Sequence, residues 1–236
     1  LAGAWLSAAF AVAQAPTTIP APSSGSAPTS LPVVAEAARD TRPRIAIAGF
    51  EADPNGDTRD VWIPVAVEEL LARRFQRVPG LLVVPTIRLQ QARRELADPA
   101  STLPDWAAVA RELGATHLLT GRCSGPDNAV ATELILHRLA ETATGKRTSL
   151  PPARLFEALD SSVRWALEQL GQAPLSEDAA SRILAAPSRS TAAVEYFARG
   201  VMTARTDQMR EALRYATQAV DYDRRFRPGL ALLAQL

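Results

Sequence analysis

The sequence predicts an α/β domain with a mixed sheet, followed by an all-α region. Three observations support this prediction. Short apolar runs alternate with amphipathic helical segments between residues 44 and 170, an order typical of helices packed on a sheet. From residue 189 onward only helical periodicity remains. Residues 172–188, with two prolines and little apolar content, separate the two regions as a linker that few contacts should cross.

The composition favours a binding protein over a catalytic one. The chain has 236 residues, 47% of them apolar, which is enough for a core without a disulfide or a metal. Its 26 basic and 25 acidic residues give a net charge of +1, so no basic excess points to nucleic acid. All but one of the basic residues are arginine, which lowers the weight of any small arginine cluster. Two such clusters are Arg73, Arg74 and Arg77, and Arg224, Arg225 and Arg227.

The first 42 residues are not expected to form a folded domain. Residues 1–15 are apolar and uncharged, and are shorter than the about 20 residues that span a bilayer. With Ala11 and Ala13 at the cleavage positions, they fit the remnant of an export signal peptide. The end of a transmembrane helix and a buried helix are the alternatives. Residues 16–42 alternate proline with serine, threonine and alanine, which predicts an extended linker.

The α/β domain is expected to cover residues 43–171 and to begin with a buried strand. Residues 44–50 are apolar on both faces, as in a central strand covered from both sides. An amphipathic helix follows over 63–78, with Asp60 as its N-cap. A second buried strand is expected at 81–84.

The second half of this domain adds three helices and two strands. Thr86 and Asp105 are placed to cap two short helices. Two strands, 116–122 and 128–140, are joined by a turn rich in glycine, proline and asparagine. A last helix spans 153–170. The expected order is β-α-β-α-α-β-β-α, a compact mixed-sheet α/β domain.

This domain resembles the amino-terminal domain of TolB and its relatives. The stretches that carry the resemblance are RIAIAGFEADPNGD, VEELLARRFQRVPGLLVV, VARELGATHLLTGRCS and LILHRLAETATGKRTS, in this order between residues 44 and 149. The family usually has an aromatic-rich strand after the Thr-Gly turn, whereas Pro151 and Pro152 cut that segment short here. The resemblance implies an exported or membrane-anchored bacterial protein.

The region 189–236 resembles a tetratricopeptide repeat (TPR), with helices expected at 190–204 and 207–222. Tyr196 and Gly200 stand where the first helix of the repeat has its aromatic and its small residue. The segment 228–236 is similar to the first helix of a next repeat, so we expect the array to continue. By this resemblance, a concave groove that binds a partner peptide or helix is lined by Phe197, Val201, Arg205, Ala231 and Gln235. The competing interpretation is that Phe197 and Val201 pack against a neighbouring helix.

The residue types that usually carry catalysis do not form a recognisable motif. His117 and His137 lie within expected strands, and Cys123 lies at a strand end, where an inert thiol is expected. Glu68 and Glu69 are adjacent on a helix and point about 100° apart, so they cannot work as one acid/base pair. We expect them to be a solvated face. No catalytic residue, metal site or cofactor is predicted.

The sequence favours two functions over a third, which is an enzyme or small-molecule binder within this chain. The first is a non-enzymatic, exported protein of the bacterial cell envelope, in the periplasm, that acts as a scaffold for protein-protein interaction through its α/β domain and repeat helices. The second is the extracytoplasmic region of a membrane-anchored signalling protein whose kinase, cyclase or winged-helix module lies upstream. Protein partners are expected in both cases, with no nucleic acid. Membrane contact is expected only through residues 1–15 if they are not cleaved.

Overall fold

The computed structural model describes residues 42–54, 60–97, 104–140 and 144–236. The predicted export signal at 1–15 and almost all of the linker at 16–42 lie outside the described residues. Within the described part, no helix is both long and apolar enough to cross a membrane. The compact unit that contains the sheet and the carboxy-terminal helices runs over Thr41–Leu236.

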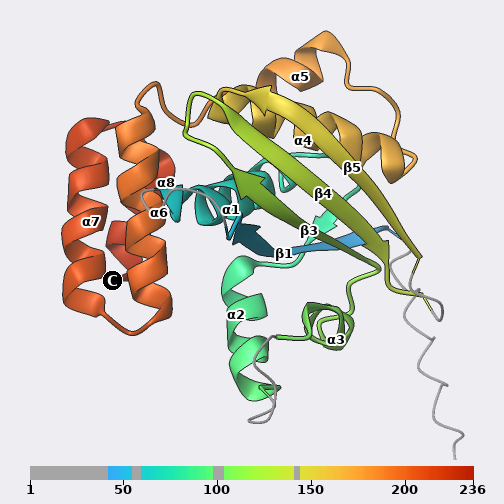
Figure 1. The fold of residues 1–236 in the computed structure, drawn as a ribbon, viewed down its shortest axis with the longest axis horizontal. Coiled ribbons are helices and arrows are strands. Elements are labelled where there is room, and N and C mark those ends of the chain that lie inside the picture. Colours follow the sequence, from blue (N-terminus) through green and yellow to red (C-terminus); the bar gives the residue numbers. More distant parts are fainter. Residues whose placement is uncertain (1–41, 55–59, 98–103, 141–143) are drawn as a thin grey trace, which may run out of the picture. The chain divides into compact units, whose positions relative to one another are not determined.

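A five-stranded mixed sheet forms the centre of this unit (Figure 1). Its spatial order is β2-β1-β3-β4-β5. The strand β1 (Arg44–Ala52) pairs in parallel with β2 (Leu82–Val83) and with β3 (His117–Ser124). The strands β4 (Val130–Arg138) and β5 (Thr144–Ala153) continue the sheet antiparallel. The predicted mixed-sheet α/β class, followed by helices, is confirmed.

Helices cover both faces of the sheet because β1 is apolar on both. Ile45 and Ile47 pack into the core that contains α1 (Ile63–Phe75) and α4 (Leu155–Gln169). Ala46 and Ala48 face the smaller core under α2 (Thr86–Glu95) and α3 (Trp106–Glu112). The next residue, Gly49, has a φ of 70°, and a Cβ there would lie 2.6 Å from the Trp106 ring, so this bulged part of β1 requires glycine.

The sheet has one strand more than the sequence predicts. Pro151 and Pro152 do not end the segment after the Thr-Gly turn, because β5 is an edge strand and needs fewer backbone donors. The register with β4 shifts between Val130 and Thr132, which are paired with Ala153 and Leu150, so a bulge accommodates the two prolines.

Two of the three predicted helix caps are wrong. Trp62 rather than Asp60 occupies the N-cap of α1, and Pro85 rather than Thr86 that of α2. Asp105 caps α3 as predicted, because its carboxylate accepts a 3.0 Å hydrogen bond from the Ala108 backbone N–H. The segment between the two predicted domains contains a helix, α5 (Glu177–Ile183).

Three helices follow the α/β part and pack against it. The helices α6 (Thr191–Arg205) and α7 (Met209–Tyr222) form an antiparallel pair, and α8 (Arg227–Gln235) contacts both. At Gly200 the pair comes close: a Cβ there would lie 3.4 Å from the Ala212 carbonyl oxygen. The outer side of α1 packs against α6. Helices before and after the segment 172–188 are therefore in contact with each other. The limits of the predicted domains stay a prediction.

Candidate functional site

A groove with a volume of about 660 Å³ lies among the helices α1, α2, α6 and α8. Phe197, Val201 and Leu232 form an apolar floor and are each less than 10% exposed. Ile87 from α2 and Met209 from the start of α7 lie at the rim, and they are 74% and 50% exposed. The groove is thus apolar below and keeps large apolar side chains in contact with solvent above.

An ion-pair network that joins α6 to α1 borders the groove, and its members Glu69, Thr86 and Arg205 line it. The Arg205 Nη2 donates to the Glu68 carboxylate at 2.6 Å and to the Glu69 carboxylate at 3.0 Å. The two carboxylate side chains are only 4% and 10% exposed, and Arg205 is 22% exposed. Thr86 adds a hydrogen bond of 3.4 Å from its hydroxyl to Glu69. These residues come from three helices, so the network fixes their relative positions.

Burial has the largest effect on the pKa of Glu68 in this network. It raises the pKa of the Glu68 carboxyl above its ordinary value, and the neighbouring Glu69 carboxylate adds to that rise. The Arg205 charge and a hydrogen bond from the Phe50 backbone N–H oppose it without cancelling it. The pKa of Arg205 is raised by the two carboxylates, so its guanidinium stays charged.

A second polar contact spans α2 and the turn after α6. The Arg94 guanidinium donates to the Arg205 carbonyl oxygen at 2.9 Å and lies 3.6 Å from the Asp207 carboxylate. Asp207 has a φ of 60° and follows Thr206, the C-cap of α6. Both Arg94 and Asp207 are largely exposed, so this pair contributes little stability and lies at the rim.

Four of the five residues predicted to bind a partner line this groove. They are Phe197, Val201, Arg205 and Gln235. Ala231, half-buried on α8, does not line it. Phe197 also packs edge-to-face on Phe226, with ring centroids 5.5 Å apart, so it belongs to the core and to the groove floor together.

The sequence analysis placed the two glutamates wrongly. Glu68 and Glu69 were expected on a solvated face, but both are buried against α6, where Arg205 bonds to both carboxylates. A signal was present: Glu68 stands three residues before Leu71 and seven before Phe75, which places it on the apolar stripe of α1. The wall contributed by α2, including Ile87, was not predicted, because no sequence pattern relates α2 to α6.

The remaining titratable residues of interest are spread over the sheet. The Cys123 thiol is buried, and burial raises its pKa to about 12. Burial lowers the pKa values of His117 and His137, which lie within 3.2 Å of the hydroxyls of Thr116 and Thr120. Among the described residues, no group of three His, Cys, Asp or Glu side chains is placed to hold a metal ion.

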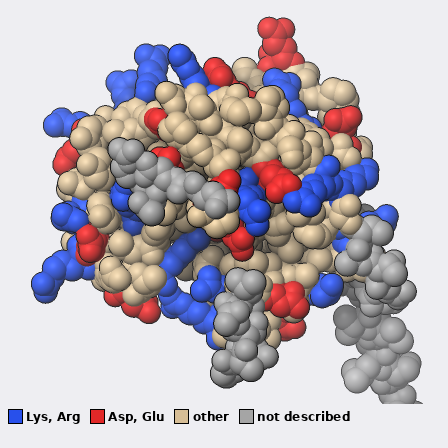
Figure 2. All heavy atoms as spheres, viewed as in Figure 1, with Lys and Arg blue, Asp and Glu red and all other residues tan. Residues whose placement is uncertain are grey.

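Charged side chains are mixed on the face seen in Figure 2. Lysine and arginine alternate with aspartate and glutamate around its edge, and neither sign forms a continuous field there. A mixed surface of this kind does not steer a polyanion such as nucleic acid towards this face.

No protein-family model matches the chain, and no curated protein matches its sequence. Its fold is distantly similar to several solved structures. The LpoB C-terminal domain from Escherichia coli is 17% identical, with a TM-score of 0.36 over 46% of this chain and 82% of that one. TolB from Acinetobacter baumannii is 14% identical, with a TM-score of 0.37 over 57% of this chain and 30% of TolB. A PelC dodecamer from Paraburkholderia phytofirmans is 14% identical, with a TM-score of 0.29 over 51% of this chain and 79% of that one. These likenesses are distant and carry no functional assignment.

Proposed function

We propose that the chain is a non-enzymatic, protein-binding module, and that its groove takes an amphipathic helix of a partner protein. The observation that carries this proposal is the exposure of Ile87 and Met209 above the apolar floor. An apolar face on the partner would cover both side chains and the floor together. Helix-in-groove recognition uses such apolar anchors at helical spacing.

The shape of the groove favours a protein segment over a small molecule. Binding pockets for small ligands enclose most of the ligand surface and hold it with a few free polar groups. Here four charged side chains of the lining are bonded to one another, in the pairs Arg205–Glu69 and Arg94–Asp207. Apolar contact therefore supplies most of the binding free energy, and the exposed rim supplies selectivity.

The test is a selection of helical peptides from a phage-displayed library on the full chain. Selected peptides are synthesised, and their affinities are measured by fluorescence anisotropy. Ile87→Asp and Met209→Asp should each weaken binding at least tenfold, because each places a charge against the apolar face of the peptide. Leu213→Asp is the matched control, since Leu213 is 46% exposed on the same helix as Met209 and lies outside the groove.

Two results would contradict the proposal. One is a selection that yields no binder. The other is a set of binders that respond to Leu213→Asp as strongly as to Met209→Asp, because their site would then lie elsewhere.

We further propose that the protein works outside the cytoplasm, exported by residues 1–15. The support is the apolar, uncharged composition of this segment and the proline-rich stretch behind it. A reporter enzyme that is active only outside the cytoplasm is fused after Leu31. It should be active in the intact fusion, and equal activity after deletion of residues 1–15 would refute export by this segment.

A further inference from the structure

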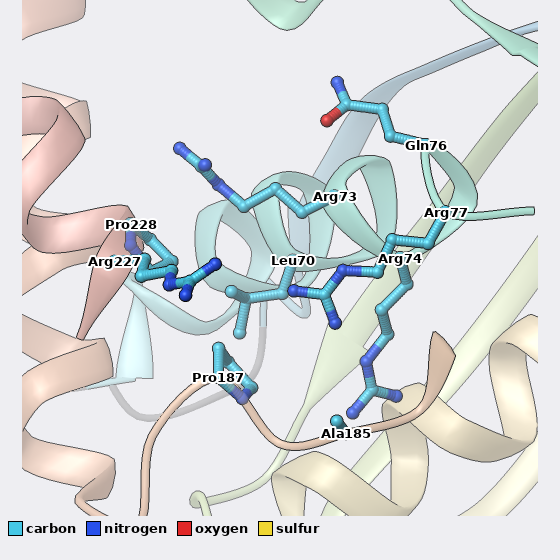
Figure 3. A pocket seen from close by; sticks show the side chains of 9 residues that line it. All are labelled: Leu70, Arg73, Arg74, Gln76, Arg77, Ala185, Pro187, Arg227 and Pro228. Carbon is cyan, nitrogen blue, oxygen red and sulfur yellow. The ribbon is translucent and has the colours of Figure 1, made fainter. Parts of the chain in front are cut away.

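Four arginines from two distant parts of the sequence line a second hollow, of about 200 Å³ (Figure 3). Arg73, Arg74 and Arg77 reach it from α1, and Arg227 reaches it from the start of α8. Its other walls are largely apolar and include Leu70, Pro187 and Pro228. The described residues that line it include no carboxylate. In the sequence these arginines belong to two separate clusters, which only the fold brings together.

Two of the four arginines have a structural role. Arg74 is 2% exposed, forms an ion pair with Asp160 and donates to the Leu184 carbonyl oxygen at 3.2 Å. Arg77 donates to the Arg182 carbonyl oxygen at 3.2 Å. Both contacts reach the carboxy-terminal end of α5, where the exposed carbonyl groups favour a cation.

The other two arginines are not explained by the fold. Arg73 lies between the hollow and the first groove and lines both; it stands over the Phe197 ring of the groove floor at 5.7 Å, and its Nε is buried without a hydrogen-bond partner among the described residues. The Nε of Arg74, one of the two structural arginines, is also buried without a hydrogen-bond partner among the described residues. For Arg227, the described part of the chain provides no hydrogen bond or ion pair, and its side chain is exposed.

The guanidinium groups around the hollow repel one another. Burial lowers the pKa of Arg73 and of Arg74, and the charge of Arg77 lowers both further. The Glu69 carboxylate opposes this effect on Arg73, and Asp160 opposes it on Arg74. Glu69 is already bonded to Arg205, so the positive charge at the hollow exceeds what its neighbours neutralise.

We propose that this hollow is a binding site for a phosphate group, held chiefly by Arg73 and Arg227. Guanidinium groups match phosphate oxygens in pairs and bind them more strongly than neutral donors do. Two forks that arrive from different helices suit a tetrahedral dianion better than a flat carboxylate. The apolar walls leave room for a short organic group on the phosphate. Free phosphate, a phosphomonoester and a phospholipid headgroup share this chemistry.

Calorimetric titration of the full chain tests the proposal at constant ionic strength. The probes are inorganic phosphate, glycerol 3-phosphate and acetate, and vesicles of phosphatidylglycerol are compared with vesicles of phosphatidylcholine. We expect saturable binding of one phosphate per chain, with acetate weaker. Arg73→Gln and Arg227→Gln should each weaken it at least tenfold. Arg210→Gln is the control, because Arg210 is exposed on α7, outside the hollow, and carries the same charge.

The arms distinguish the sources of the phosphate. Binding of inorganic phosphate or glycerol 3-phosphate, weakened by Arg227→Gln, supports a soluble ligand. Binding of phosphatidylglycerol vesicles alone, with the same dependence on Arg227, supports a lipid headgroup. The proposal is overturned if no probe binds, or if Arg210→Gln weakens binding as much as Arg227→Gln. Arg227 is exposed, so its substitution does not threaten the fold, and a thermal melt of each variant verifies this.

Discussion

Folding changes the ionisation of the Glu68 carboxyl. Its carboxylate is buried between α1 and α6, and the resulting rise of its pKa means that the folded state binds its proton more tightly than the unfolded state does. As the pH rises from the unfolded value of about 4.5, the folded state loses this advantage. The contribution of Glu68 to stability therefore falls as the pH rises through its folded pKa.

We therefore expect Glu68→Gln to be at least as stable as the natural chain at pH 7. Glutamine mimics the neutral carboxyl and still accepts a hydrogen bond from Arg205, without the cost of burying a second negative charge. The difference in melting temperature between the variant and the natural chain should shrink to nothing as the pH falls below about 4.5. Calorimetric melts between pH 4 and pH 8 measure it. Glu168→Gln, on the exposed side of α4, controls for the change in net charge.

Cys123 is expected to be chemically inert in the folded protein. Its side chain is buried at the end of β3, and with a pKa of about 12 almost none of it is thiolate at pH 8. Ellman's reagent at pH 8 should leave it unmodified on the timescale of minutes and titrate one thiol per chain in guanidinium chloride. Rapid reaction of the native protein would show that β3 opens locally or that the thiol is accessible.

The ion pairs between α6 and α1 hold these two helices together. Arg205 is the cation within hydrogen-bond distance of both Glu68 and Glu69. We expect Arg205→Ala to lower the free energy of unfolding by about 3 kcal/mol at pH 7, because it leaves two buried carboxylates without the cation that hydrogen-bonds to both. The loss should be smaller at pH 4, where protonation removes those charges. Urea unfolding at both pH values measures it.

A matched control for this prediction lies on α7. Arg214 pairs with Glu211 at 2.6 Å, but the two side chains are 60% and 43% exposed. Arg214→Ala should change the free energy of unfolding by less than about 0.5 kcal/mol. If both variants lose a similar free energy of unfolding, burial does not make the α1–α6 ion pairs more stabilising than the exposed pair on α7.

The sequence predicts most elements, because each has its own periodicity or turn. The helices α6 and α7 follow from their amphipathic spacing, and β1 follows from a run that is apolar on both faces. The extent of β5 through Pro151 and Pro152 could not be predicted, because it depends on the strand lying at an edge with a bulge. Half of the groove was predictable from the repeat-like helices. The wall from α2 was not, because it depends on the approach of α2 to the end of α6, where Arg94 donates to the carbonyl oxygen of Arg205, 111 positions later in the chain.

For the whole molecule, the structure leads to a prediction about fragments. Residues 43–171 contain the whole sheet and should melt cooperatively on their own, but at a lower temperature than the full chain, because they lose the apolar contact with α6. Residues 189–236 should not, because their apolar residues, such as Phe197, lose the cover that α1 provides. Calorimetry and sedimentation of the two fragments test this. A cooperative melt of a monomeric 189–236 fragment would refute it.

The contact between Arg205 and Glu68 also sets an order of events in time. The two residues are 137 positions apart in the chain. At a synthesis rate of about 5–20 residues per second, α1 leaves the ribosome roughly 7 to 27 seconds before Arg205 does. During that interval α1 can fold onto the sheet, but its outer side faces water and Glu68 is an ordinary carboxylate. The proton affinity of this side chain therefore changes only when α6, which lies in the last fifth of the chain, packs against α1, and it reports that late step of folding.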